Sequence, residues 1–194
     1  MGKLTTFTFI SLDGYYKGLH EDISWHRHGA EEGAFSADSL SAGNVLLFGR
    51  RTYGMMESFW PTPMAAEQFP QVAEGMNRAA KIVFSRTLTG VTWSNTRLVK
   101  EDMIGEVRRL RQQSSRNLTL LGSGSVLTQL AGAGLIDEYS VMIDPVALGR
   151  GSSLFEALPH KLDLELTGSR VFSSGVVLLT YQPAGTQNGD VQAS

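Results

Sequence analysis

The sequence of 194 residues contains no cysteine. This absence excludes disulfide bonds, thiol nucleophiles and zinc sites built on thiolates, and it is what we expect of a protein in the reducing cytoplasm. The chain also lacks an excess of one charge, because 17 lysines and arginines balance 19 aspartates and glutamates and leave a net charge of −2. We therefore expect neither nucleic acid nor an anionic membrane surface as a partner.

Long hydrophobic runs are absent too. No apolar stretch of the sequence approaches the roughly 20 residues that a membrane-spanning helix needs. The first residues, MGKLTTFTF, alternate like a strand and lack the apolar core of a signal peptide. Hydrophobic residues still make up 42% of the chain, which is enough for a proper core at this length. We expect one domain over residues 1–183 and a disordered tail, rich in small and polar residues, over residues 184–194.

Short apolar runs alternate with segments of helical spacing through most of the chain. Strands are predicted at 4–10, 45–48, 81–84, 97–99, 118–121 and 138–144, and helices at 31–41, 52–58, 64–78, 101–113 and 126–133. In the helix at 31–41 we expect Ala34, Phe35 and Leu40 to face inward. A hairpin at 162–172 and 176–182 closes the chain. This order predicts an α/β domain with a largely parallel sheet and an antiparallel edge.

The stretch LTLLGSGSVLTQ, residues 118–129, joins a buried strand to a helix through a glycine and serine turn. Such a turn presents free backbone N–H groups to an anion, and its glycines allow close approach of the backbone. Ser123 or Ser125 can cap the helix or bond a phosphate. Many ordinary strand–helix turns also contain glycine and serine, so this motif alone is weak.

Two further turns of the same kind follow predicted strands. They are Gly49-Arg50-Arg51-Thr52 and Ser85-Arg86-Thr87. Strand-to-helix turns of a parallel sheet share the edge where ligands of such sheets bind, and arginine offers a planar fork for phosphate oxygens. Taken singly, each arginine is more simply a surface residue. Three such turns together favour a ligand with several phosphates, although the GxGxxG fingerprint of the common dinucleotide fold is missing.

The chain resembles the dihydrofolate-reductase-like superfamily, and within it the C-terminal reductase domain of the bifunctional riboflavin biosynthesis protein with its single-domain bacterial relatives. The resemblance rests on these pieces, which run in order from about residue 4 to residue 182: FISLDGY, VLLFGRRTY, IVFSRTL, LTLLGSGSVLTQL, LIDEYSVMIDPVALGRGSSLF and the closing hairpin. It implies a three-layer α/β/α fold and NADPH as the cofactor.

The resemblance also implies a place for each part of NADPH. Arg50 and the Ser85-Arg86 turn match positions that hold the 2′-phosphate, and Arg51 and Thr52 match positions that reach the diphosphate. The glycine turn reaches the diphosphate from a second helix start. The cofactor residues predicted in this way are Gly49, Arg50, Arg51, Thr52, Ser85, Arg86, Thr87, Gly122, Ser123, Gly124, Ser125 and Val126. Relatives often have consecutive glycines in the last turn. Ser123 would then crowd the diphosphate or donate a hydrogen bond to it.

By this resemblance the protein is an NADPH-dependent reductase of a small heterocyclic, ribosyl or carbonyl substrate. The family's known reaction reduces the ribosyl group of a pyrimidine riboside phosphate in riboflavin synthesis. Two alternatives stay open: a non-catalytic NADP(H)-binding regulatory protein, and a dihydrofolate reductase. The second needs a carboxylate on the first long helix, which cannot be aligned securely with Glu31, Glu32 or Asp38. Asp13, at the end of the first strand, is the candidate catalytic residue, and its alternative role is to shape the Asp-Gly turn.

Other polar and aromatic residues give weaker signals. His26 and His28 form a His-x-His pair without an evident third ligand, so we expect no metal site. Trp25, Trp60 and Phe155 are candidates for lining a flat heterocycle site, or else simple core residues. The closing hairpin is apolar on both faces over residues 176–179, and we therefore expect a homodimer that covers the second face.

Overall fold

The computed structural model describes residues 1–27, 29–113 and 115–185. Its main feature is an eight-stranded sheet with the strand order β5-β4-β3-β6-β1-β7-β10-β9. The strands of this sheet are β1 (Leu4–Ser11), β3 (Val45–Gly49), β4 (Lys81–Phe84), β5 (Thr96–Val99), β6 (Leu118–Leu121), β7 (Glu138–Asp144), β9 (Leu164–Val171) and β10 (Val177–Pro183). The first six in the spatial order run parallel, and β10 and β9 pair antiparallel at one edge. The predicted mixed sheet with its antiparallel hairpin is confirmed.

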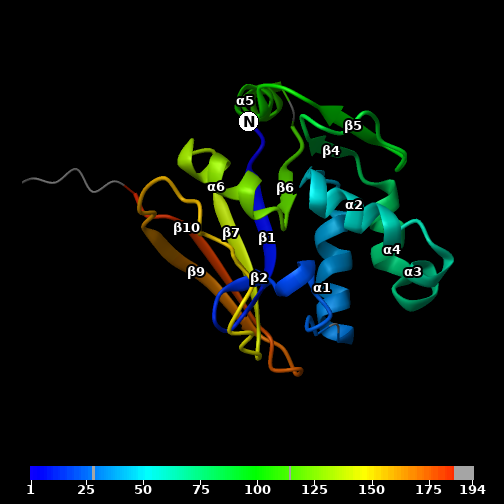
Figure 1. Ribbon diagram of the computed structural model, residues 1–194, viewed down its shortest axis with the longest axis vertical. Coiled ribbons are helices and arrows are strands. Elements are labelled where there is room, and N and C mark those ends of the chain that lie inside the picture. Colours follow the sequence, from blue (N-terminus) through cyan, green and yellow to red (C-terminus); the bar gives the residue numbers. More distant parts are fainter. Residues whose placement is uncertain (28, 114, 186–194) are drawn as a thin grey trace, which may run out of the picture.

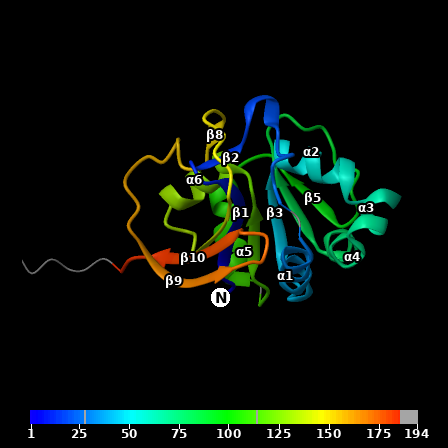
Figure 2. The same cartoon turned by 90° about the horizontal axis from the view of Figure 1, so that it is seen from below.

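Helices cover both faces of this sheet. They are α1 (Ala30–Ser41), α2 (Arg50–Phe59), α3 (Pro63–Gln68), α4 (Pro70–Arg78), α5 (Met103–Gln113) and α6 (Gly124–Gly132). Side chains of α5 and α6 pack into one core cluster, and those of α1, α2 and α4 pack into another on the opposite face. Figure 2 shows α6 on one side of the central strands β1 and β3, and α1 to α4 on the other. The result is a three-layer α/β/α domain. No helix in the described ranges is long and apolar enough to cross a membrane.

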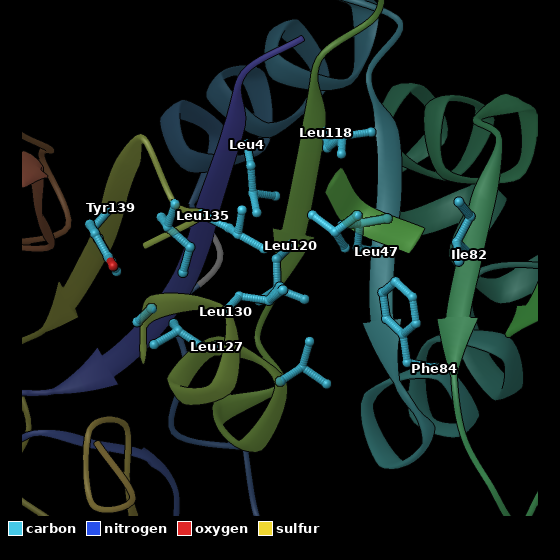
Figure 3. Packing of buried hydrophobic residues seen from close by; sticks show 14 of the residues in the cluster. Leu4, Leu47, Ile82, Phe84, Leu118, Leu120, Leu127, Leu130, Leu135 and Tyr139 are labelled. Atoms are coloured by element: carbon cyan, nitrogen blue, oxygen red, sulfur yellow. The ribbon is translucent and has the colours of Figure 1, made fainter. Parts of the chain in front are cut away.

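The larger core cluster lies between the central strands and α6. Leu118 and Leu120 of β6 are fully buried, and Leu127 and Leu130 of α6 pack against the same face (Figure 3). The alternation explains why the LTLL run forms a central strand, because leucines two residues apart project from the same face of a sheet. The strand thereby fixes where the glycine turn that follows it lies.

Several helix boundaries differ from the prediction. Helices α1 and α6 begin one and two residues earlier than expected. Helix α2 begins at Arg50, two residues earlier than expected, because Gly49 is extended and acts as its N-cap. Helix α5 begins later than predicted, at Met103, since the Asp102 carboxylate accepts the Gly105 N–H at 3.0 Å like a helix cap. The predicted helix at 64–78 is two helices that meet at Phe69, just before Pro70.

The segment between β1 and α1 is more ordered than the predicted loop. It contains β2 (Tyr15–Lys17) and a 3-10 turn at Leu19–Glu21, and β2 pairs with β8 (Ser152–Ser153) in a separate two-stranded sheet. In α1 the prediction for Ala34 is wrong, because this residue is exposed and the inward face is formed by Phe35, Ala37 and Leu40. The predicted disordered tail lies, from residue 186 onward, outside the described residues.

Candidate functional site

Three turns that follow parallel strands meet at one edge of the sheet. The turns after β3 and β6 lead into helices as predicted, but the turn after β4 leads into a connection to β5. The three strands β4, β3 and β6 are parallel neighbours in that order. Parallel strands end at the same edge, so the turns after them form a continuous surface. A cleft with a volume of about 1190 Å³ opens there and extends along the sheet to the starts of β1, β6 and β7, where Thr5, Thr119 and Glu138 also line it. All twelve predicted cofactor residues line this cleft: Gly49, Arg50, Arg51, Thr52, Ser85, Arg86, Thr87, Gly122, Ser123, Gly124, Ser125 and Val126.

The turn after β6 is held in a left-handed conformation. Gly122 and Ser123 have φ values of 54° and 60°. The Ser123 hydroxyl accepts the Gly49 N–H at 2.9 Å and donates to the Leu121 carbonyl at 3.0 Å, which ties the turn to the end of β3. It makes no side-chain cap bond to α6. The first N–H groups of a helix lack partners within the helix, so the start of α6 can still bind an anion.

The two arginine turns differ in how they are anchored. Arg50 and Arg51 lie in the first turn of α2, and both are exposed. In the turn after β4, the Ser85 hydroxyl accepts the N–H groups of Thr87 and Leu88 at 3.2 and 3.0 Å. This local bonding fixes the backbone and leaves the neighbouring guanidinium exposed to solvent. The arginines therefore project from rigid turns at the mouth of the cleft.

An ion-pair network crosses the mouth of the cleft. Arg51 donates to Glu21 at 2.8 Å, and Glu21 also accepts two bonds from the buried ammonium of Lys17. The hydrogen bond from Lys17, followed by the charges of Lys17 and Arg51, lowers the pKa of Glu21 against the opposing effect of burial. Neither Glu21 nor Lys17 was predicted as a site residue, because both reach the cleft only through the pairing of β2 with β8. Gly151 permits that approach, since a Cβ on it would lie 2.2 Å from the Lys17 carbonyl.

Tyr16 lies beside the same turn and was also missed. A Cβ added at Gly124 would lie 2.9 Å from the ring of Tyr16. Only glycine therefore fits at the start of α6 while the tyrosine ring keeps its place. The side chain of Thr52 is close to this turn as well, 3.5 Å from where a Cβ of Gly122 would be. The first turn of α2 and the turn before α6 thus form adjacent walls.

The other end of the cleft is aromatic. Strand β1 continues past Phe7, its last residue paired with β6, to Ser11. This end is lined by side chains from β1, from the segment before α1, from α1 and from the second half of α2, namely Phe7, Phe9, Ile23, His26, Phe35, Met55, Met56 and Trp60. His26 stacks on Phe9 with ring centroids 4.9 Å apart. Trp60 lines the cleft and also packs against the core cluster that includes Tyr53 and Met76, so it fits both of its predicted roles. Trp25 instead packs against His26, and Phe155 packs in the core.

Asp13 does not belong to the described residues that line the cleft. Its carboxylate accepts the Ser11 hydroxyl at 2.6 Å and the N–H groups of Leu148 and Gly149 at 3.0 and 2.7 Å. These hydrogen bonds, that of Ser11 foremost, lower the pKa of Asp13 to about 2. The side chain is therefore ionised at neutral pH and holds no proton to donate. Its contacts are those expected of the turn-shaping alternative, and its catalytic role stays a prediction.

The variant Asp13→Asn separates the two roles. We expect it to lower the melting temperature, because an amide cannot accept hydrogen bonds from Ser11, Leu148 and Gly149 as a carboxylate does. Asp38→Asn, at an exposed position of α1, serves as the matched control. Steady-state kinetics of NADPH oxidation complete the test. A kcat lower by about 10²- to 10⁴-fold, the size expected for a lost general acid–base group, would assign Asp13 the catalytic role.

The other polar candidates lie apart from the cleft. Glu32 is buried and accepts a short hydrogen bond from the Ser174 hydroxyl, Glu31 accepts the Ser173 N–H at 3.1 Å, and Asp38 is exposed. None of the three is among the described residues that line the cleft. His28 lies outside the described residues, and the described ones contain no group of three side chains that could hold a metal ion.

Comparison with known proteins identifies relatives over nearly the whole chain. The family model of the RibD C-terminal domain matches residues 2–178. Among curated proteins, the uncharacterized protein YyaP of Bacillus subtilis (strain 168) is 27% identical over 172 residues, which cover 89% of this chain and 90% of YyaP. The uncharacterized protein YwjB of the same organism is 24% identical over 178 residues, which cover 91% of this chain and 95% of YwjB.

Solved structures show the same fold. A putative riboflavin biosynthesis protein from Shewanella sp. PV-4 superposes with a TM-score of 0.73 at 23% identity, covering 94% of this chain and 99% of that one. A diaminohydroxyphosphoribosylaminopyrimidine deaminase/5-amino-6-(5-phosphoribosylamino)uracil reductase from Thermotoga maritima gives 0.67 at 13% identity, covering 94% of this chain and 57% of that one. At these identities the likeness concerns the fold.

Proposed function

The chain belongs to the RibD C-terminal domain family, and we propose that it is an NADPH-dependent reductase of a small molecule. The single observation that carries this proposal is the cleft itself. All twelve predicted cofactor residues line it, and it continues into an aromatic end. Its volume of about 1190 Å³ exceeds the roughly 300–1,000 Å³ typical of pockets for one small ligand. This volume is compatible with the binding of a cofactor together with a substrate.

The strand order supports one direction for the cofactor. Arg86 follows β4, Arg50 and Arg51 follow β3, the glycine turn follows β6, and the aromatic end begins at β1. The guanidinium group of an arginine binds a 2′-phosphate well, and the N–H groups at a helix N-terminus bind a diphosphate. Along this line the adenosine end would lie at β4 and β3, the diphosphate between α2 and α6, and the nicotinamide ring at β1. The ring would then meet the aromatic end.

The residues of the chain would bind and orient, and the chemistry would come from the cofactor. Bound NADPH supplies a hydride, so the protein needs little beyond position and electrostatics. Arg50, Arg51 and Arg86 would hold the phosphates. Phe9 and Trp60 would confine a flat substrate and exclude water from it. The proton that completes the reduction comes from a side chain or from water.

A non-catalytic NADP(H)-binding regulatory protein is the second candidate, because the same cleft serves binding without turnover. Two measurements on the purified protein decide between the functions. Titration with NADPH followed by its fluorescence gives the Kd, and absorbance at the NADPH band follows oxidation in the presence of candidate carbonyl and heterocyclic substrates. Tight binding with oxidation supports the reductase. Binding without oxidation for any substrate supports the regulatory protein, and absence of binding contradicts both.

We also propose that the protein forms a homodimer through its hairpin edge. Strand β9 is the outer strand, and it exposes two large apolar side chains, Leu166 at 53% and Val171 at 72%. An exposed apolar edge strand is a site for pairing with another chain. Half-buried Val177 and Leu179 of β10 lie opposite Ile143 and Val141 of β7.

Light scattering at micromolar concentration should give about twice the chain mass of 21.1 kDa. The double variant Leu166→Lys/Val171→Lys should give a folded monomer, because both side chains are exposed in the single chain and a charge there costs it little. Leu12→Lys, at another exposed leucine, should leave the dimer intact. A monomeric wild-type protein would contradict the dimer.

A further inference from the structure

Lysines and arginines are unevenly distributed along the cleft, whose lining also contains the carboxylates of Glu21, Glu101, Asp102, Glu138 and Glu156. Five cationic residues line it, and they are Lys17, Arg50, Arg51, Arg86 and Lys100. Four of them follow β3, β4 or β5, and the fifth, Lys17 in β2, is bound to Glu21 at the mouth. The aromatic end, from Phe7 to Trp60 as defined above, has no lysine or arginine among its described lining residues.

The nearest cation in sequence does not reach the aromatic end. Arg27 follows His26, but its guanidinium donates to the Ser174 carbonyl at 2.8 Å and is not among the described residues that line the cleft. Its backbone N–H donates to Asp144 at 2.8 Å. The backbone of the segment that carries His26 is thus anchored to the end of β7. The guanidinium of Arg27 is held at the turn of the hairpin.

Two buried carboxylates lie behind the aromatic end instead. Asp144 is fully buried, and Glu32, three residues before Phe35 in α1, is 2% exposed. One oxygen of Asp144 is buried and has no hydrogen-bond partner in the described part of the chain. Burial raises the pKa of Asp144 and so disfavours its charged form. A dianion brought to this end would lose its hydration and would meet no guanidinium or ammonium group, and both effects oppose binding of a phosphate.

Apolar and polarisable groups line the same space. The ring of Phe9 and the imidazole of His26 are stacked, and the ring centroids of Phe7 and Phe35 are 5.9 Å apart. Met55 and Met56 add the thioether groups of their side chains. Flat rings and thioethers favour planar, uncharged, conjugated molecules. Ser36 and Ser39 of α1 also line the cleft and supply neutral hydroxyl groups.

We propose that the substrate of this protein is a planar, uncharged aromatic or heteroaromatic compound with a reducible C=O or C=N bond and without a phosphate group. This inference rests on the proposed NADPH-dependent reduction. The substrate carbon gains a hydride from the cofactor, the π bond to the heteroatom breaks, and the heteroatom gains a proton. The substrate is reduced by two electrons and NADPH is oxidised to NADP⁺. The phosphates of the cofactor would occupy the part of the cleft that Arg50, Arg51, Arg86 and Lys100 line. These cations would then not be available to bind a phosphate of the substrate.

A matched pair of probes tests the substrate class. 6-Methoxy-2-naphthaldehyde and 6-formyl-2-naphthyl phosphate share a flat aldehyde and differ in the phosphate. Calorimetric titration of the protein saturated with NADP⁺ should give a Kd for the neutral aldehyde at least about 10-fold lower, the equivalent of one uncompensated polar contact. With NADPH, kcat/KM should be higher for the neutral aldehyde. Equal affinities, tighter binding of the phosphate, or binding of neither probe would overturn the proposal.

A gain-of-function variant sharpens the test. Ser36→Arg adds a cation to the aromatic end and should lower the Kd for the phosphate probe, whereas Ser94→Arg, at an exposed position outside the cleft, should not. An unchanged Kd in a folded Ser36→Arg protein would mean that the phosphate is rejected for another reason and would contradict the role assigned to missing charge. The Kd for NADPH is measured separately on each protein. If the wild-type protein does not bind NADPH, the proposed function is refuted. If it binds NADPH but prefers the phosphate probe, only the proposed substrate class is refuted.

Discussion

Replacing Arg86 with alanine is expected to raise the Kd for NADPH about 10- to 150-fold, because a charge-assisted hydrogen bond to a phosphate is worth roughly 1.5–3 kcal/mol. The Kd for NADH should hardly change, since NADH has no 2′-phosphate. Arg86 is exposed on a turn that Ser85 holds rigid, so its removal should not disturb the fold. Fluorescence titrations with both cofactors measure the effect.

The controls for this prediction come from the same cleft and from outside it. Arg108→Ala removes an exposed arginine of α5 that is not among the described lining residues, and it should leave both Kd values unchanged. Glu101 follows β5 and lines the cleft near Arg86, which sequence reasoning did not foresee. A carboxylate there repels the 2′-phosphate of NADPH, so Glu101→Gln should lower the Kd for NADPH. Equal affinity of the wild-type protein for NADPH and NADH would refute the predicted selectivity.

Replacing Arg111 with methionine is expected to lower the free energy of unfolding by about 3 kcal/mol, the lower end of the range for breaking a buried ion pair. Arg111 is 8% exposed, and it donates to the carbonyls of Gly2 and Leu135 and to Asp137 at 2.8 Å. Asp137 in turn accepts the Leu4 N–H at 2.7 Å. The variant would leave these acceptors without their donor where α5 meets the start of β1. The side chain of Asp137 is 34% exposed, which lets water replace part of the loss.

Arg109→Met is the matched control on the same helix. Arg109 pairs with Glu106, but its side chain is 49% exposed. Exposed ion pairs contribute roughly 0–1 kcal/mol, so this variant should unfold close to the wild-type midpoint in urea. Similar losses for the two variants would show that the buried network at Arg111 adds no special stability.

Much of the sheet could be predicted from the sequence because local signals agree with the fold. The strands at 81–84, 118–121 and 138–144 were predicted with the bounds that the structure shows. Each is a short apolar run bounded by glycine, polar or turn residues, and burial between two helical layers gives such runs their composition. The three turns proposed to bind phosphates could be located in the same way, because they directly follow the predicted strands at 45–48, 81–84 and 118–121.

The rest of the site depends on contacts that are distant in sequence. Glu21, the partner of Arg51, lies in the 3-10 turn after β2, and the position of β2 depends on its pairing with β8, more than 130 residues later in the sequence. Phe9, Phe35 and Trp60 line the same cleft only because β1, α1 and α2 all border it. Figure 1 shows these elements together beside the centre of the sheet. The local pattern of apolar residues in a sequence does not predict which distant elements lie side by side. Helix starts were missed for a local reason, since the N-cap conformation of Gly49 and the capping carboxylate of Asp102 decide them.

A structure of the protein with bound NADP⁺ would show directly whether the cleft holds the cofactor as proposed. We expect the 2′-phosphate within hydrogen-bond distance of Arg50 and Arg86, the diphosphate against the N–H groups at 122–125, and the nicotinamide ring beside Phe9. NADP⁺ bound away from these turns, or with its diphosphate at the aromatic end, would contradict the proposal.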